Sequence, residues 1–171
     1  ARDIKAAYKK GTRSPDGRPG KIYWQNSGRY DISISVAPPN QNVKGVEHIN
    51  YVNNSPDTLS RLNMKLIMNI HRPGAARFST TSTDYLTDGI QVDTFKVNGQ
   101  AKNWNNVTAR ATNQAVALSK PLMPHDSVKL DIVWHYQLAK GRGREGVIDS
   151  TTFYLAYFYP RVSVYDDYNG W

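Results

Sequence analysis

Apolar and polar residues alternate along much of the chain from residue 30 onward. Successive side chains of a β-strand point to opposite faces, so a period of two predicts a strand with one buried face. Clear runs of this kind cover 30–36, 62–70 and 128–136. The apolar positions that we predict as core in the two longer runs are Leu62, Met64, Leu66, Met68, Ile70, Leu130, Ile132 and Trp134.

Turn signals separate these runs. Asn98 and Gly99 follow one apolar run, and this pair predicts a tight hairpin because both residues tolerate a positive φ. The alternation changes phase between Val92 and Phe95, which predicts a β-bulge there. Short strands of this kind, without a long helical period, predict an all-β fold, either an antiparallel β-sandwich or a saddle-shaped curved sheet.

An aromatic stretch near the end of the chain supplies the candidate binding residues. Residues 151–159 are apolar on both faces, which is typical of a strand covered on both sides. Within and just after this stretch lie Tyr157, Phe158, Tyr159 and Arg161. Aromatic rings beside an arginine also stack on bases or sugars, so a binding role stands beside the core interpretation.

The first part of the chain differs in composition from the rest. The net charge is +8, and residues 1–30 hold eight Lys or Arg against two Asp. Glycine and proline interrupt any periodic pattern there, so we predict an irregular basic leader over 1–29 before a β domain over 30–171. A charge confined to a leader favours a solvated, dispensable arm, and we expect no nucleic-acid binding.

Residue types needed for catalysis or metal binding lack the required spacing. Cysteine is absent, which excludes disulfides and thiolate metal ligands. The histidines stand outside any H-E-x-x-H pattern, and we expect them at the surface or at strand edges. They are His48, His71, His125 and His135. We therefore expect no catalytic residue and no metal or cofactor site in this chain.

Two further features exclude other roles. No apolar run approaches the roughly 18 residues of a membrane span, so none is expected. The adjacent carboxylates Asp166 and Asp167 are expected in a capped turn, because a catalytic pair needs environments that separate the two pKa values.

Several short stretches, spread in order over nearly the whole chain, carry a family resemblance. Two of them are Tyr-Val-Asn-Asn-Ser-Pro-Asp from residue 51 and Tyr-Pro-Arg-Val-Ser-Val-Tyr-Asp-Asp from residue 159. The complete set covers 11–14, 19–26, 51–59, 84–90, 97–99, 121–127 and 159–167. As an ordered set they resemble the N-terminal domain of bacterial zinc metallopeptidases of the aminopeptidase N family, the gluzincins.

The resemblance implies a saddle-like β domain that packs on a downstream catalytic domain and forms one wall of the peptide-binding cleft. Zinc, its ligands and the general base would all lie in that downstream domain, so further sequence is expected after Trp171. The expected partners are the catalytic domain and the peptide substrate. The resemblance also implies export to the periplasm or the extracellular space.

One position departs from the family pattern. Aminopeptidases of this family place Gln or Glu near the end of this domain to bind the substrate's free amine, and Tyr157 stands there in our alignment. A phenol lacks the charge of a carboxylate. Endopeptidase activity, altered exopeptidase activity and an inactive parent protein therefore stay open. The alternative function is a free-standing β-sandwich module that binds protein or carbohydrate.

Overall fold

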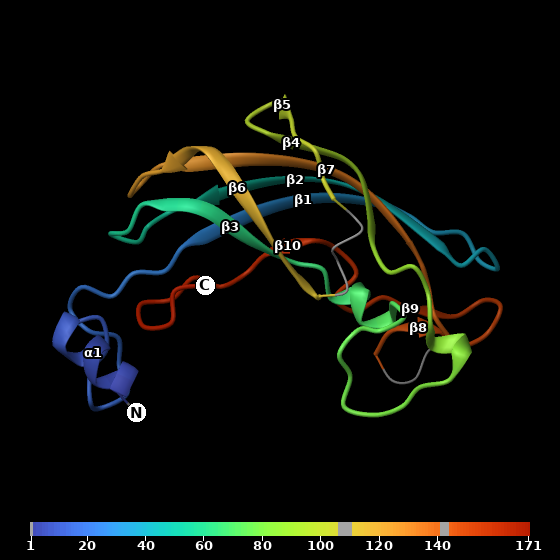
Figure 1. Ribbon diagram of the computed structural model, residues 1–171, viewed down its shortest axis with the longest axis horizontal. Helices are drawn as coiled ribbons and strands as arrows, with labels where there is room; N and C mark the ends of the chain where they lie inside the picture. Colours follow the sequence, from blue (N-terminus) through green and yellow to red (C-terminus); the bar gives the residue numbers. More distant parts are fainter. Residues whose placement is uncertain (1, 106–110, 141–143) are drawn as a thin grey trace.

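The structure, a computed structural model, describes residues 2–105, 111–140 and 144–171. A five-stranded antiparallel sheet forms the arch that spans the molecule in Figure 1. Its strands, in spatial order, are β1 (Ser27–Ser35), β2 (Asn42–Val52), β7 (Ser127–Gln137), β4 (Gln91–Val97) and β5 (Gln100–Ala101). The predicted all-β class is therefore confirmed.

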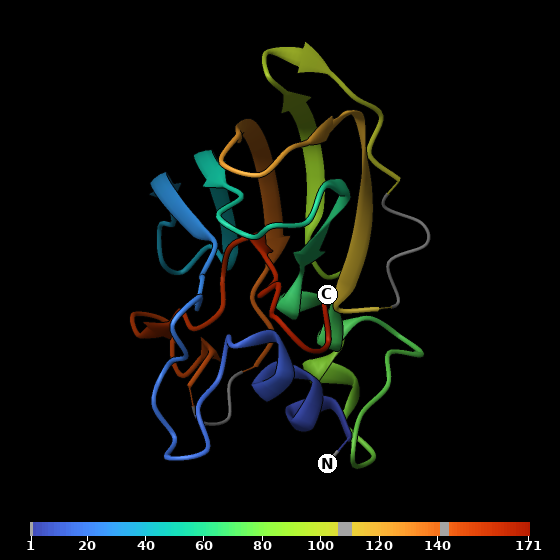
Figure 2. The same cartoon turned by 90° about the vertical axis from the view of Figure 1, so that its left-hand side faces the viewer.

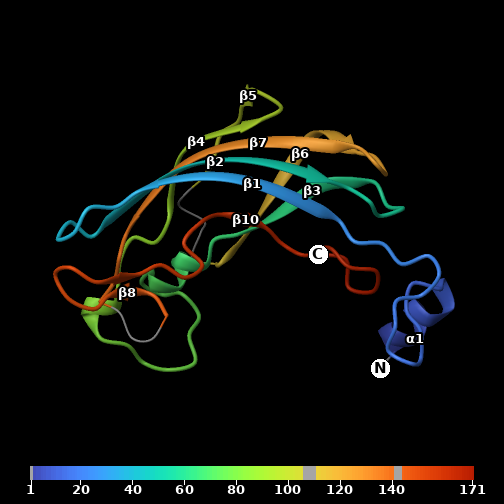
Figure 3. The same ribbon diagram turned by 180° about the vertical axis from the view of Figure 1, so that it is seen from behind.

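A second antiparallel sheet lies beneath the arch, and smaller elements close its two ends (Figure 1). Its strands, in spatial order, are β10 (Arg161–Val162), β3 (Leu59–Lys65) and β6 (Asn113–Leu122). The helix α1 (Arg2–Lys10) lies at one end beside the C-terminal segment (Figure 2). The opposite end, seen from behind in Figure 3, holds the β8–β9 hairpin and two 3-10 helices. Their bounds are β8 (Gly146–Val147), β9 (Phe153–Tyr154), η1 (Ile67–His71) and η2 (Thr83–Tyr85).

The core lies between the two larger sheets, where the alternating residues of β2, β3 and β7 meet. Seven of the eight predicted core side chains are at most 1% exposed; the exception is Ile70, which is half-buried. The strand ends at Lys65 and the chain turns into η1, so a period of two no longer fixes the face beyond Leu66. The prediction of Ile70 as a core strand residue is therefore wrong.

Both predicted local irregularities of β4 are confirmed. The β4–β7 register shifts between Val92 and Thr94, where the bulge is expected. Asn98 and Gly99 connect β4 to β5 with φ values of 50° and 78°. Asn98 is also tied to β7, because its backbone N–H donates to Lys129 O at 2.8 Å and its Oδ1 accepts from the Lys129 N–H at 2.9 Å.

The predicted terminal strand over 151–159 is largely absent. Only Phe153–Tyr154 is a strand, and Tyr157 has a φ of 58°. A left-handed residue interrupts the extended backbone that a ladder requires, so the chain runs irregularly until it pairs again with β3 through β10. The apolar composition that suggested a doubly covered strand belongs instead to an irregular segment packed against the core.

The leader is more ordered than its composition predicts. Residues 2–10 form α1, in which Ala7 is fully buried, and Gly11 ends the helix with a φ of 75°. Lys9 and Lys10 lie in the last turn, where cations suit the helix dipole. The prediction of an irregular segment therefore fails for α1. No helix among the described residues has the length and apolar character of a membrane span.

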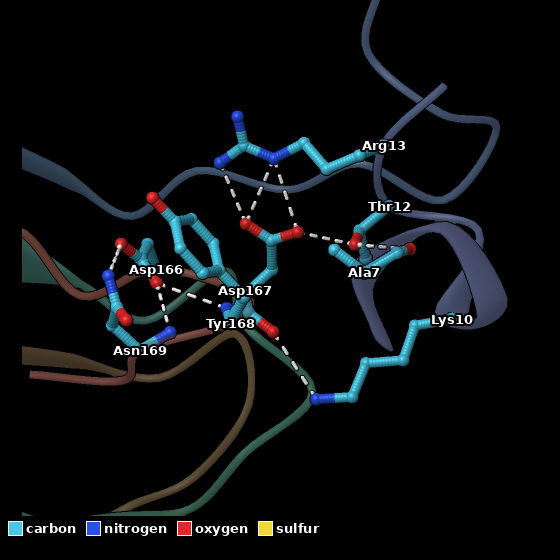
Figure 4. A network of polar contacts seen from close by, with 8 residues as sticks. All are labelled: Ala7, Lys10, Thr12, Arg13, Asp166, Asp167, Tyr168 and Asn169. Atoms are coloured by element: carbon cyan, nitrogen blue, oxygen red, sulfur yellow. Dashed lines mark hydrogen bonds and ion pairs between the residues drawn. The ribbon is translucent and has the colours of Figure 1, made fainter. Parts of the chain in front are cut away.

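A buried carboxylate ties the leader to the C-terminal segment (Figure 4). Asp167, with a side chain 3% exposed, accepts from Thr12 Oγ1 at 2.5 Å and from Arg13 Nη2 at 2.7 Å. The Arg13 hydrogen bonds are the main reason that the pKa of Asp167 falls to about 2. Lys10 Nζ donates to the Asp167 carbonyl oxygen at 3.3 Å. A dispensable leader is no longer expected, because its loss would leave a buried carboxylate without partners.

The neighbouring carboxylate caps a turn. Asp166 Oδ1 accepts from the backbone N–H groups of Tyr168 at 3.0 Å and Asn169 at 2.6 Å. The two adjacent acids therefore have separate structural roles, consistent with the expected capped turn.

Truncating Ile132 to Ala should cost about 2–5 kcal/mol of unfolding free energy, because the site is fully buried between the sheets. Urea unfolding monitored by circular dichroism measures the change. Val46→Ala, on the exposed face of the adjacent strand, is the matched control and should cost far less. Equal effects for the two variants would contradict the assignment of the core face.

Replacing Asp167 with Asn should destabilise the fold by about 2 kcal/mol at pH 7, because the charge-assisted bonds to Arg13 are lost. The lowered folded-state pKa means that this stabilisation is present above the unfolded pKa near 3.8 and is lost as the pH falls through about 2. Urea melts between pH 2 and 7 measure both effects. The exposed control Asp88→Asn should leave the wild-type profile unchanged, and a wild-type profile for Asp167→Asn would refute the anchoring role.

Candidate functional site

Two of the four candidate residues have packing roles. The Phe158 ring lies 6.2 Å from the Trp134 ring and 5.0 Å from the Tyr159 ring. The Tyr159 ring contacts Tyr30 edge to face at 5.8 Å. Such aromatic contacts hold the irregular segment against the arch. Phe158 and Tyr159 therefore support the segment that carries the other two candidates.

Tyr157 and Arg161 lie close together on the outside of this segment. Tyr157 is 43% exposed, and the Arg161 guanidinium carbon lies 6.0 Å from the centre of its ring. Arg144 approaches from the loop before β8, and its Nη1 donates to Tyr157 Oη at 3.3 Å. Two guanidinium groups therefore approach one phenol, one toward its ring and one at its hydroxyl.

A third cation belongs to the same surface. Lys65 of β3 is the direct antiparallel partner of Arg161 of β10, so both side chains lie on one face of the small sheet. The next pair, Met64 and Val162, lies on the opposite face, where Met64 is buried in the core. We call Lys65, Arg144 and Arg161, together with Tyr157, the basic cluster.

The acid that follows Arg144 in sequence is engaged elsewhere. Glu145 Oε2 lies 2.8 Å from His71 Nε2, and the other ring nitrogen of His71 lies 2.9 Å from Tyr85 O. Both ring nitrogens of His71 therefore have an oxygen partner within hydrogen-bonding distance. His71 is 2% exposed, so its expected surface position is wrong. Its carboxylate and carbonyl partners explain how a polar ring is tolerated in the interior.

The other histidines lie at the surface as expected. His48 and His135 pair with Asp131 and Asp93 at 2.7 and 2.9 Å, and His125 is exposed. Such exposed pairs contribute little to stability. No group of three potential metal ligands occurs among the residues that the structure describes.

Sequence reasoning also missed a buried carboxyl group on the concave side of the arch. Glu47 of β2 is fully buried, and burial raises its pKa to about 8. The pattern contained the signal, because Glu47 shares its strand face with Val43, Ile49 and Tyr51. A charged residue at an inward position of an alternating strand is a position to inspect.

A surface pocket of about 620 Å³ opens beside η2 and the loop over 76–82. Serine and threonine side chains contribute much of its lining, together with Tyr85. Asp84 and Lys140, which also line it, pair with each other at 3.5 Å. None of the predicted site residues lines this pocket.

Arg144 and Lys65 could not be assigned from spacing alone. Arg144 belongs to a glycine-rich basic loop whose path is not fixed by periodicity. Lys65 joins the cluster through the β3–β10 register, and β10 has only two residues. The available signal was the chemical one, namely the arginines of the glycine-rich loop and the arginine after the aromatic stretch.

The chain is thus an all-β domain with an exposed aromatic and basic surface. No protein-family model matches it, and no curated protein matches it. Among solved structures, an M1 zinc metallopeptidase from Deinococcus radiodurans matches with a TM-score of 0.45 and 19% identity over 70% of this chain and 22% of that chain. A mutant two-domain M1 zinc metallopeptidase bound to L-arginine matches with a TM-score of 0.46 and 18% identity over 74% of this chain and 24% of that chain. This chain therefore spans less than a quarter of the length of either protein.

Glu47→Gln should flatten the pH dependence of stability at neutral to alkaline pH. Because the folded-state pKa is raised to about 8, the stabilising contribution of the protonated acid is present below about pH 4.5 and is lost as the pH rises through 8. The neutral amide keeps a similar shape, so the variant should exceed wild type in unfolding free energy at pH 8 by a few kcal/mol, at about 1.4 kcal/mol per unit of pKa shift.

Urea unfolding at pH 5, 6.5 and 8 measures this difference. Asp31→Asn, an exposed acid on the neighbouring β1, is the control and should retain the wild-type slope. An unchanged slope in Glu47→Gln would mean that Glu47 is not the group that titrates.

Proposed function

We propose that this chain is a non-catalytic N-terminal domain of an aminopeptidase N-like zinc metallopeptidase, in which it forms one wall of the peptide-binding cleft. The ordered sequence stretches described above suggest this family. The observation that carries the proposal is the exposure of Tyr157 at the position where the resemblance expects contact with the substrate. A tyrosine buried in a core strand could not take this role.

In this proposal catalysis belongs to a separate domain. That domain would supply zinc and the general base, and the present chain would contribute shape and binding contacts. Export to the periplasm or the extracellular space is part of the same proposal and rests on the resemblance.

The way Tyr157 is supported suits a wall position. Phe158 packs on Trp134 and Val162 pairs with Met64, so contacts with both sheets hold the residues on either side of Tyr157 and Arg161. The exposed side chains can then meet a ligand without a large ordering cost.

Photo-crosslinking in the full gene product tests the proposal. Tyr157→p-benzoylphenylalanine should label a bound peptide substrate, because the side chain at this position would line the cleft. Val46→p-benzoylphenylalanine, on the outer face of the arch, is the control and should give no peptide adduct. Mass spectrometry of the adducts identifies the labelled segment.

The contradicting results are equally specific. Absence of a peptide adduct at position 157, or equal labelling at positions 46 and 157, would contradict a cleft wall. A protein or carbohydrate adduct in place of the peptide would favour a binding module.

A further inference from the structure

The basic cluster places like charges side by side. Lys65 and Arg161 are direct cross-strand partners, an arrangement that is destabilising for two cations. Arg144 adds a third positive charge, because its guanidinium and that of Arg161 both approach Tyr157. The surface therefore concentrates positive charge at one place on the fold.

No acid of the described part of the chain neutralises this charge. The ion pairs of the described residues involve other cations, and none includes Lys65, Arg144 or Arg161. Glu145 would be the obvious partner for Arg144, but its side chain is only 18% exposed and bonds to His71. The cluster thus keeps several N–H donors for a ligand from outside.

The geometry favours an anion that presents two oxygens. A guanidinium presents paired N–H donors that match the two oxygens of a carboxylate. The phenol of Tyr157 occupies only one donor of Arg144, and the half-exposed ring offers a flat surface beside it. A free ammonium would be repelled by three cations at the same place.

We propose that Arg144 and Arg161, which both approach Tyr157, form a subsite for a peptide carboxylate together with Lys65, the strand partner of Arg161. That the carboxylate belongs to a peptide rests on the proposed function, whereas the anion site itself rests on this chain alone. The position that relatives use for an amine would then recognise the opposite charge.

Titration of the ¹⁵N-labelled chain, followed by NMR of backbone amides and arginine Nε–H groups, tests the subsite. The probes are one N-acetylated tripeptide with a free C-terminal carboxylate, its C-terminal amide, and an amidated peptide carrying one glutamate side chain. Carboxylate-bearing peptides should shift signals of the basic cluster and bind about tenfold or more tightly than the amide. The two carboxylate arms distinguish a C-terminus from an acidic side chain.

Variants that remove one charge test whether binding depends on the basic cluster. Arg144→Gln and Arg161→Gln should each weaken carboxylate binding about tenfold. Arg29→Gln makes the same charge change at an exposed position of β1, and should leave the affinity within about twofold.

Three results would overturn the proposal. The peptide acid and its amide could bind equally well, or Arg29→Gln could weaken binding as much as Arg144→Gln and Arg161→Gln do. Inorganic phosphate could also bind as tightly as the peptide and displace it. These measurements use this chain alone, so they test the anion site separately from the cleft role. If the chain binds carboxylates but Tyr157 gives no crosslink in the full gene product, the cleft role is contradicted and the anion site is supported.

Discussion

The close packing of Trp134 on Gly45 positions one of the largest fully buried side chains of the core. These residues are direct partners on β7 and β2, and a Cβ at position 45 would overlap the indole ring. Glycine lets the ring lie flat over the centre of the arch, where it stacks with Tyr136 at 6.0 Å. Phe158 packs on the same indole ring, and this contact holds the aromatic segment against the arch. Gly45 thus supports, through Trp134 and Phe158, the segment that carries Tyr157 more than 100 residues later in the sequence.

The partners of the acidic side chains explain which basic residues lack an acidic partner. Composition alone assigned the basicity to the leader, but Lys10 and Arg13 are bonded to Asp167. Elsewhere the Glu145 carboxylate is hydrogen-bonded to His71, and burial favours the neutral form of Glu47. The cations of the small sheet and the preceding loop are therefore left without acidic partners, although neither segment stands out in the overall charge distribution.

Periodicity was sufficient where the backbone is regular. The face assignments of β7 and of Leu62, Met64 and Leu66 follow directly from alternation, as does the bulge before Phe95. It failed at Ile70 and in the aromatic stretch, because apolar composition does not distinguish a strand from an irregular segment that packs its side chains inward. It also missed α1, which is short and whose last residue, Lys10, contacts the Asp167 carbonyl oxygen.

The candidate site shows a similar division. Chemistry along the sequence suggested Tyr157 and Arg161, whose role stays a prediction. Arg144 and Lys65 required a loop path and a strand register, which no local pattern supplies. Phe158 and Tyr159 have the same composition signal as Tyr157 but contact the core, because the left-handed backbone at Tyr157 changes the direction of the segment.

The bond between Arg13 and Asp167 joins residues 154 positions apart. During synthesis Arg13 is made before Asp167, and at ordinary rates of synthesis roughly 8–30 s separate the two residues. During this interval Arg13 and Thr12 lack the carboxylate that ties the leader to the C-terminal segment. The docking of the leader on the C-terminal segment is therefore a late event of biosynthesis, although the leader precedes the rest of this domain in the sequence.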